Sequence, residues 1–260
     1  MIKKETEKFL DSNIFEGMTS ISALINAIKL NKNNRKIEKI LFDEDKLKNK
    51  RPEFGFLRAN AEILGYELEI CDSDKISKLT IGSSHGGIIA ICGDRIIQKL
   101  SVENIKKDGL YYILEGVEDP YNFGNAIRSL YASGADGIIV GSRNWMGAAG
   151  VVARSSAGTS ELIDIYQVTD SSEAISILKK LDYTVVSAGI RDSVDLFEIN
   201  LKKPLLVIIG GEKRGISRAV LDMSDHIVRI DYANDFKGSL STSASASVFG
   251  FEISRKLRNL

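Results

Sequence analysis

The sequence has few cysteines, few histidines, no excess of either charge and no long apolar run. Cys71 and Cys92 are its only cysteines, too few for a disulfide framework or a cysteine-rich metal site, which fits a reducing cytoplasm. No apolar stretch reaches the roughly 18 residues of a membrane span, and the polar segment 1–13 lacks the apolar core of a signal peptide. These absences predict a cytoplasmic protein without a membrane partner.

Charge is balanced along the chain, because Lys and Arg together number 35 and so do Asp and Glu. This balance excludes the global basic field that marks many nucleic-acid binders, so any such surface must be local. The basic segments 29–39 and 46–51 are candidates, although a run of charge is usually only a solvated face. With 260 residues, 43% of them hydrophobic, the chain can bury one large core or two smaller ones.

Helix and strand signals alternate along the first hundred residues. The expected elements are helices over 19–31 and 51–65 and strands over 37–43, 66–71 and 86–92. The first helix is expected to follow an N-cap at Thr19 or Ser20 and to bury a face that carries Ile21, Leu24, Ile25 and Ile28. These elements are enough for a compact α/β unit.

From Leu110 onward, short and nearly all-apolar strands alternate with helices. The expected strands are 110–116, 137–141, 161–168, 183–188, 204–211 and 226–232, and the expected helices are 122–134, 148–158, 171–182 and 240–257. This alternation predicts a parallel sheet that is covered on both faces. The polar segment 96–108 contains no strong strand, so we expect it to link a domain over 1–95 to another over 109–260.

Three loops after these strands carry groups that bind ligands, and ligands of parallel sheets bind beyond the carboxyl ends of the strands. The loops hold Asn122 and Arg128, the segment 210–217, and a Ser-rich segment that leads into the last helix. None has the G-x-G-x-x-G spacing of a dinucleotide turn. Each also has a plain structural explanation: Asn122 as an N-cap, Arg128 as an exposed helical residue, 210–217 as a turn, and the serines as caps or small packing residues.

Taken together and in order, the segments 118–129, 205–217 and 227–252 resemble the three motifs of the SPOUT superfamily, in its SpoU (TrmH-like) branch. The resemblance covers about 110–257, and the first hundred residues look like the RNA-binding domain often fused to it, which resembles the ribosomal protein called L-thirty. The fold implied is α/β, with a C-terminal parallel-sheet domain that contains a deep trefoil knot and a smaller α/β RNA-binding domain before it. The resemblance also implies a homodimer, with the helices of the first and third motifs near the interface.

The activity implied by the resemblance is 2′-O-methylation of a ribose in structured RNA, with S-adenosyl-L-methionine as the donor. Ribosomal RNA is favoured over transfer RNA, because the N-terminal module resembles that of ribosomal-RNA enzymes. The positions that match the catalytic residues are Asn122, Arg128, Glu212 and Ser239. The positions that match the donor site are Ser187, Ala188, Gly210, Gly211, Ile230 and Leu240.

Methyl transfer requires a hydroxyl oxygen aligned with the methyl carbon, and an alcohol is a poor nucleophile until its proton leaves. The three loops contain no histidine, and the sequence does not identify the general base. Since a guanidinium keeps its proton, we expect Arg128 to bind an RNA phosphate and to stabilise developing alkoxide charge. Glu212 is expected to position the hydroxyl or Arg128, and Asn122 to hold its loop.

The third motif departs from the family pattern. Asp231 and Tyr232 stand where the family usually has Pro-Met, and Ser241 stands where it usually has asparagine, whose amide reaches further. These departures motivate an alternative, an RNA-binding or assembly factor with a decayed methyltransferase site, which the presence of Arg128 and Glu212 opposes. Further alternatives are a transfer-RNA 2′-O-methyltransferase and another nucleotide-dependent α/β enzyme, although the latter needs a phosphate loop. The residues support no metal site.

Overall fold

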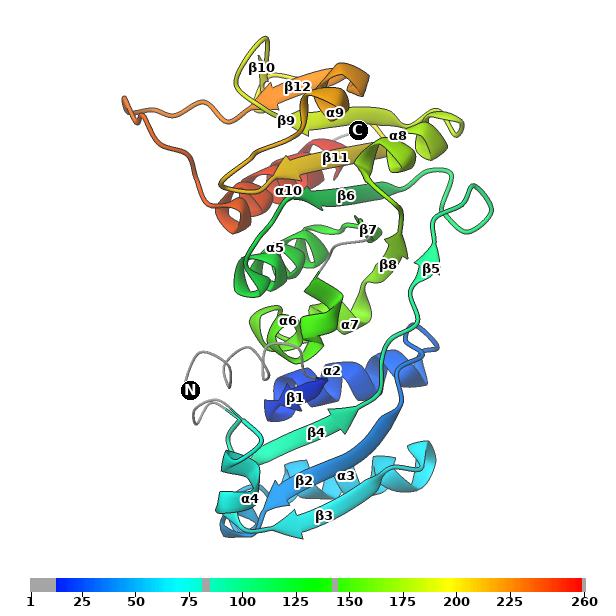
Figure 1. Cartoon of the computed structure of the whole chain (residues 1–260), viewed down its shortest axis with the longest axis vertical. Coiled ribbons are helices and arrows are strands. Elements are labelled where there is room, and N and C mark those ends of the chain that lie inside the picture. Colours follow the sequence, from blue (N-terminus) through cyan, green and yellow to red (C-terminus); the bar gives the residue numbers. More distant parts are fainter. Residues whose placement is uncertain (1–12, 81–84, 142–144, 259–260) are drawn as a thin grey trace. The chain divides into compact units, whose positions relative to one another are not determined.

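The computed structural model describes residues 13–80, 85–141 and 145–258 (Figure 1). By contacts the chain divides into two compact units, Met1–Ile96 with Trp145–Leu162, and Ile97–Asn144 with Ile163–Leu260. Because the first unit includes a segment from the middle of the sequence, the units are interleaved along the chain. The expected domains, 1–95 and 109–260, are continuous stretches of sequence, whereas each of these units joins two separate stretches. The expected domains therefore stay a prediction.

The first unit contains a four-stranded sheet in the order β1-β4-β2-β3, in which only β2 and β3 pair in parallel. Its strands are β1 (Ile14–Glu16), β2 (Ile37–Asp43), β3 (Glu67–Cys71) and β4 (Ile88–Cys92). Its helices are α2 (Gly17–Lys29), α3 (Arg51–Leu64), α4 (Ser73–Ser77), α6 (Ala149–Ser155) and α7 (Thr159–Leu162), with 3-10 turns at Glu44–Lys46 and Trp145–Ala148. The predicted strands and the first two predicted helices are confirmed.

The first helix begins earlier than its sequence pattern indicates. Its N-cap is Glu16, at the end of β1, and Gly17 turns the chain with a φ of 79°, so the expected cap at Thr19 or Ser20 is wrong. A glycine accepts this left-handed conformation without steric cost. The predicted apolar face is confirmed, because Ile21, Leu24 and Ile25 are fully buried; the fourth member of that face, Ile28, packs partly buried against the same core.

A buried polar cluster fastens α7 to the rest of the first unit. The carboxylate of Glu161 accepts hydrogen bonds from Asn33 Nδ2 at 2.7 Å and from Arg35 Nε at 3.2 Å. The side chains of Arg35 and Glu161 are 1% and 0% exposed. Arg35 also donates through Nη1 to the Gly93 carbonyl at 2.6 Å and lies over the ring of Phe15. Both charges are thus removed from water and compensated by specific partners.

The second unit contains an eight-stranded sheet in the order β10-β12-β9-β11-β6-β7-β8-β5, and every neighbouring pair in it is parallel. Its strands are β5 (Gln98–Lys99), β6 (Leu110–Glu115), β7 (Gly137–Val140), β8 (Asp164–Gln167), β9 (Thr184–Ala188), β10 (Val194–Asp195), β11 (Leu205–Gly210) and β12 (His226–Arg229). The predicted parallel sheet is confirmed. The segment 96–108 does contain a strand, β5, which is too short to leave a periodic signal.

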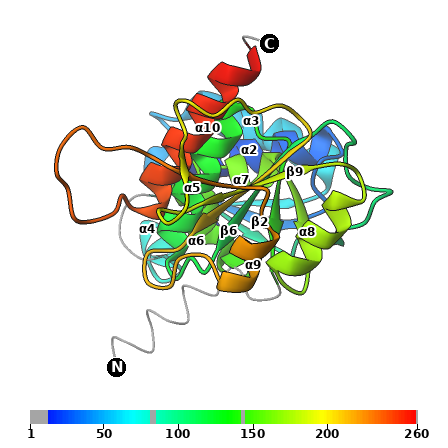
Figure 2. The ribbon, with the colours of Figure 1, turned by 90° about the horizontal axis from the view of Figure 1, so that it is seen from above.

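Helices cover both faces of this sheet. They are α5 (Pro120–Ser133), α8 (Ser171–Lys179), α9 (Arg218–Met223) and α10 (Thr242–Arg258). Figure 2 shows α5 and α10 on one face and α8 and α9 on the other. The first pair approaches closely, since a Cβ on Gly250 would lie 2.6 Å from Ser133 Oγ. Among the described residues, no helix combines the length and apolar character needed to cross a membrane.

Candidate functional site

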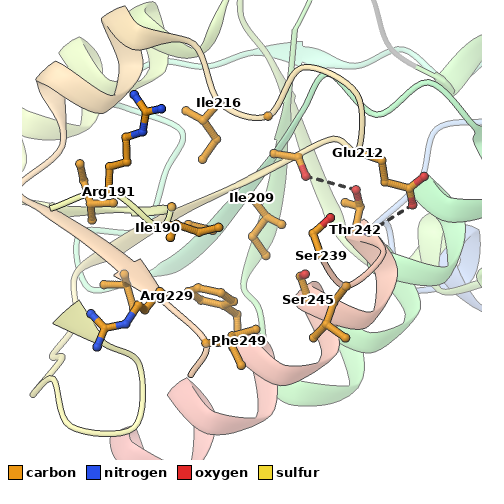
Figure 3. Close-up of a pocket in the computed structure, with 18 of the residues that line it drawn as sticks. Ile190, Arg191, Ile209, Glu212, Ile216, Arg229, Ser239, Thr242, Ser245 and Phe249 are labelled. Atoms are coloured by element: carbon orange, nitrogen blue, oxygen red, sulfur yellow. Dashed lines mark hydrogen bonds between the residues drawn. The ribbon is translucent and has the colours of Figure 1, made fainter. Parts of the chain in front are cut away.

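The carboxyl ends of β9, β11 and β12 border a pocket of about 1330 Å³ in the second unit (Figure 3). Part of its lining is apolar and comes from Ile209, Ile216 and Phe249, while Glu212 and two serines line another side. The serines are Ser239, in the loop after β12, and Ser245, on α10. The pocket therefore offers an apolar surface next to polar groups, which is the usual character of a small-molecule site.

Glu212 ties the three motif loops together. Its Oε1 accepts a hydrogen bond from Asn122 Nδ2 at 3.1 Å and another from the backbone N–H of Thr242 at 3.4 Å. Thr242, which is 2% exposed, donates through its hydroxyl to the Gly210 carbonyl at 3.1 Å (Figure 3). The expectation that the three loops lie together is confirmed, because the carboxylate of Glu212 in the second motif loop contacts residues of the first and third motifs.

Asn122 does not cap its helix. The N-cap of α5 is Asp119, whose carboxylate accepts hydrogen bonds from the N–H groups of Tyr121 and Asn122 at 3.1 and 3.2 Å. The interpretation of Asn122 as an N-cap is therefore wrong by three residues. Its side-chain amide is free to bind Glu212, so the residue links the first motif to the second.

Glycines let the backbones of two motif loops touch. A Cβ on Gly211 would lie 2.1 Å from the Gly116 carbonyl oxygen, and one on Gly210 would lie 2.7 Å from the carbonyl carbon of Gly215. The N–H of Gly211 donates to the Glu115 carbonyl at 2.6 Å. These contacts hold the turn after β11 against the end of β6 and leave no room for a side chain.

Replacing Gly211 by alanine is expected to lower the free energy of unfolding by about 1–3 kcal/mol, because the loop must move to accommodate the methyl group. Urea unfolding followed by circular dichroism measures this change. Gly55 is the matched control, since it lies in α3 and a Cβ there would meet nothing within 4 Å. Equal stability of the Gly211→Ala and Gly55→Ala proteins would contradict the tight contact.

Ser241 caps α10. Its hydroxyl accepts a hydrogen bond from the N–H of Ala244 at 3.2 Å, and its carbonyl accepts one from Ser245 at 2.9 Å. Serine and asparagine are both strong N-caps. The departure from the family's asparagine therefore preserves the start of the helix, although serine presents no amide to the pocket.

Asp231, the second departure, has a partner in this chain. Arg229 binds it through two nitrogens, at 2.6 Å from Nε to Oδ1 and 3.1 Å from Nη2 to Oδ2. The bond from Arg229 lowers the pKa of Asp231, so the carboxylate stays ionised at neutral pH. Both residues line the pocket, and the paired geometry is bidentate.

The pocket includes most of the positions that the family resemblance indicates. Glu212, Ser239, Ala188, Gly210, Gly211, Ile230 and Leu240 line it. Ser187 is fully buried outside the lining and lies 2.7 Å from Ser224, between the two hydroxyl oxygens. Asn122 reaches the lining only through Glu212, and Arg128 is exposed on α5.

Sequence reasoning missed four arginines that line the pocket, namely Arg191, Arg214, Arg218 and Arg229. Arg191 follows the carboxyl end of β9, and Arg214 follows that of β11. This position beyond a strand end was the only sequence signal that could have indicated a role at the pocket. A single arginine in a loop has the same sequence appearance as an ordinary solvated residue, so the signal was weak.

The family model of the SpoU rRNA Methylase family matches residues 109–251. A TrmH family tRNA/rRNA methyltransferase of Staphylococcus haemolyticus is 34% identical over 152 residues, which are 58% of this chain and 61% of that protein. One of Staphylococcus saprophyticus is 35% identical over 144 residues, 55% of this chain and 57% of that protein. The match thus spans about three fifths of these relatives.

The fold also resembles solved structures. An RNA 2′-O ribose methyltransferase superposes with a TM-score of 0.75 and 24% identity, over 95% of this chain and 89% of that one. An AdoMet-bound rRNA methyltransferase from Sinorhizobium meliloti gives a TM-score of 0.75 and 23% identity, over 99% of this chain and 91% of that one. At these identities the likeness establishes the fold.

Proposed function

The chain belongs to the SpoU rRNA methylase family, and on this premise we propose that it transfers a methyl group from S-adenosylmethionine to a ribose 2′-hydroxyl of RNA. The observation that carries this proposal is the connection of the three motif loops through Glu212 at one pocket. The same three loops carry the sequence motifs that resemble the family. The sequence pattern and the geometry of the pocket therefore indicate the same site.

The residues of the pocket fit the donor. An adenine ring requires an apolar surface, which Ile209, Ile216 and Phe249 supply, and closely approaching backbone, which the glycines after β11 supply. When bound, the donor brings a methyl group already activated on a sulfonium. Structures of the same fold were solved with AdoMet, including AviRb from Streptomyces viridochromogenes, and this supports the assignment. A volume of about 1330 Å³ also leaves space for part of an acceptor.

The protein's own residues align the acceptor and stabilise its charge. Arg128 is exposed on α5, and among the described residues its guanidinium has neither a hydrogen bond nor an ion pair. It is therefore available to an RNA phosphate and to the negative charge that develops on the ribose oxygen. The bond from Asn122 holds the Glu212 carboxylate in one orientation at the pocket, which makes Glu212 and Ser239 the polar groups that position the hydroxyl.

We place the RNA contacts of the first unit on its exposed lysines. Lys32 and Lys36 in the first basic segment and Lys46 and Lys48 in the second are exposed. Arg35 is excluded, because it is buried against Glu161. Ribosomal RNA is the favoured target, with transfer RNA as the alternative; the names of the Staphylococcus relatives include both.

We also propose that two copies of the chain form a homodimer through α5 and α10. We further propose that the second unit contains the trefoil knot implied by the family resemblance. Three large side chains on these helices are exposed, namely Tyr121, Tyr131 and Phe251, at 41%, 36% and 53%. Burying such aromatic surface favours association.

Methyl transfer from labelled S-adenosylmethionine to total bacterial RNA tests the activity. Label is expected in ribosomal RNA and in alkali-resistant dinucleotides, because a 2′-O-methyl group blocks hydrolysis of the adjacent phosphodiester. Label in alkali-sensitive nucleotides would contradict ribose methylation, and label in transfer RNA alone would select the alternative target. Binding of the donor without transfer to either RNA would favour an RNA-binding factor with a decayed site.

A further inference from the structure

Charged side chains of both signs line the pocket, in a chain that carries no net charge. Five cationic side chains line it, namely Arg191, Arg214, Arg218, Arg229 and Lys237, against three anionic ones, Asp192, Glu212 and Asp231. Asp222 and Asp235, which pair with Arg218 and Lys237, bring the carboxylates to five as well, so attraction of an anionic ligand depends on individual side chains rather than on a net field.

Three of these cations form an ion pair with a carboxylate, and the other two form none among the described residues. Arg218 pairs with Asp222 at 2.9 Å, Arg229 with Asp231 at 2.6 Å, and Lys237 with Asp235 at 2.6 Å. Within the described part of the chain, the guanidinium groups of Arg191 and Arg214 make neither a hydrogen bond nor an ion pair. Both side chains are exposed, so both are available to a ligand.

The two arginines occupy neighbouring loops at the same edge of the sheet. Arg191 follows β9 and Arg214 follows β11, and these strands pair directly. In Figure 3 the side chain of Arg191 rises on the side of the pocket where Ile216 lies, and Ile216 belongs to the same turn as Arg214. The arrangement places beside one opening two guanidinium groups that make no hydrogen bond or ion pair in the described part of the chain, although Arg214 is near enough to Glu118 to help lower the pKa of that carboxyl.

The chemistry of the ligands decides which anion they serve. S-adenosylmethionine carries a sulfonium, an ammonium and one carboxylate, so its net charge is positive and two unpaired arginines nearby oppose its binding. RNA brings one phosphate for each nucleotide, and a guanidinium matches phosphate with two parallel hydrogen bonds. Resting on the proposed function, we propose that Arg191 and Arg214 are positioning residues that bind backbone phosphates of the RNA next to the ribose entering the pocket.

The double variant Arg191→Ala, Arg214→Ala tests this assignment with two separate titrations. Affinity for a fluorescein-labelled single-stranded RNA of mixed sequence, measured by anisotropy, is expected to fall about tenfold for each arginine removed. The slope of log affinity against log salt should flatten by roughly 0.7 for each lost phosphate contact. The dissociation constant of S-adenosylmethionine, measured by calorimetry, should stay the same.

Two further proteins sharpen the comparison. Arg258→Ala removes an exposed arginine from the last turn of α10, outside the pocket, and should leave RNA affinity near that of the wild type. The double variant Arg191→Lys, Arg214→Lys keeps the charge and should retain the salt slope while losing part of the affinity, because lysine lacks the bidentate fork. In turnover, the KM for ribosomal RNA should rise while kcat stays the same.

Unchanged RNA affinity in the double alanine variant would overturn the assignment. Weaker donor binding with unchanged RNA binding would also overturn it and would assign the arginines to the donor's carboxylate. Absence of methyl transfer by the wild type would instead contradict the proposed function, and the RNA titration would still decide the role of the two arginines.

Discussion

Replacing Arg128 by alanine is expected to lower the rate of methyl transfer about 100- to 1000-fold, which is the usual cost of losing one group that stabilises developing charge. Affinity for S-adenosylmethionine should stay the same, because Arg128 is absent from the lining of the pocket. Stability should change by less than about 0.5 kcal/mol, since the side chain is exposed. Turnover, donor titration and urea unfolding of the same preparation measure the three quantities.

The form of the pH profile separates two roles for Arg128. A guanidinium keeps its proton throughout the working range, so a charge-stabilising Arg128 predicts parallel profiles for the wild type and the alanine variant. Loss of an ionisation from the profile of the variant would indicate a general base instead. Arg128→Lys should recover part of the rate, because lysine keeps the charge without the bidentate geometry. A rate in Arg128→Ala equal to that of Arg258→Ala, an exposed arginine outside the pocket, would contradict either role.

The strands that build the site follow from local sequence. The apolar runs of β6 and β11 lie within the predicted strands, and a glycine stands at or directly after the carboxyl end of each. Parallel pairing then brings the ends of these strands to the same edge. The proximity of the motif loops could therefore be predicted. The bond from Asn122 to Glu212 spans 90 positions, and no local signal indicates which side chains meet over that distance.

The cap of α5 shows the same limit on a smaller scale. Asp119 and Asn122 are both good N-cap residues, and the sequence offers them three positions apart. Pro120 resolves the choice in the structure, because it occupies the first turn of the helix, where its missing N–H costs nothing. The side chain of Asn122 is thereby left to bind Glu212.

The burial of Glu161 was not predictable, because a glutamate in this position has the sequence pattern of a solvated residue. Its partner Arg35 lies 126 positions away, in a basic segment that resembles an RNA-binding surface. The structure places this arginine inside the first unit, so only the lysines around it remain candidates for phosphate. Tertiary pairing has thus changed the interpretation of the charge pattern.

Replacing Arg35 by alanine is expected to destabilise the first unit by about 3–5 kcal/mol, because the Glu161 carboxylate stays buried without its charged partner. The only tryptophan of the chain, Trp145, belongs to this unit, so its fluorescence in urea reports the unfolding of the first unit separately. Arg58→Ala is the matched control, since Arg58 is an exposed arginine on α3 of the same unit. The two variants are compared by their free energies of unfolding. A difference of less than about 1 kcal/mol, which is the range of exposed ion pairs, would mean that Arg35 and Glu161 are not effectively buried.

The double variant Arg35→Met, Glu161→Leu separates the net contribution of the pair from the cost of an orphaned charge. Apolar replacements of similar volume remove both desolvation penalties together, and such exchanges are often neutral or stabilising. Recovery of most of the wild-type stability would show that the loss in Arg35→Ala comes from the unpaired carboxylate. Failure to recover would instead assign the stability to the wider network, because the amide of Asn33 donates to Glu161 and the carbonyl of Gly93 accepts from Arg35, and both groups would then lose their partners.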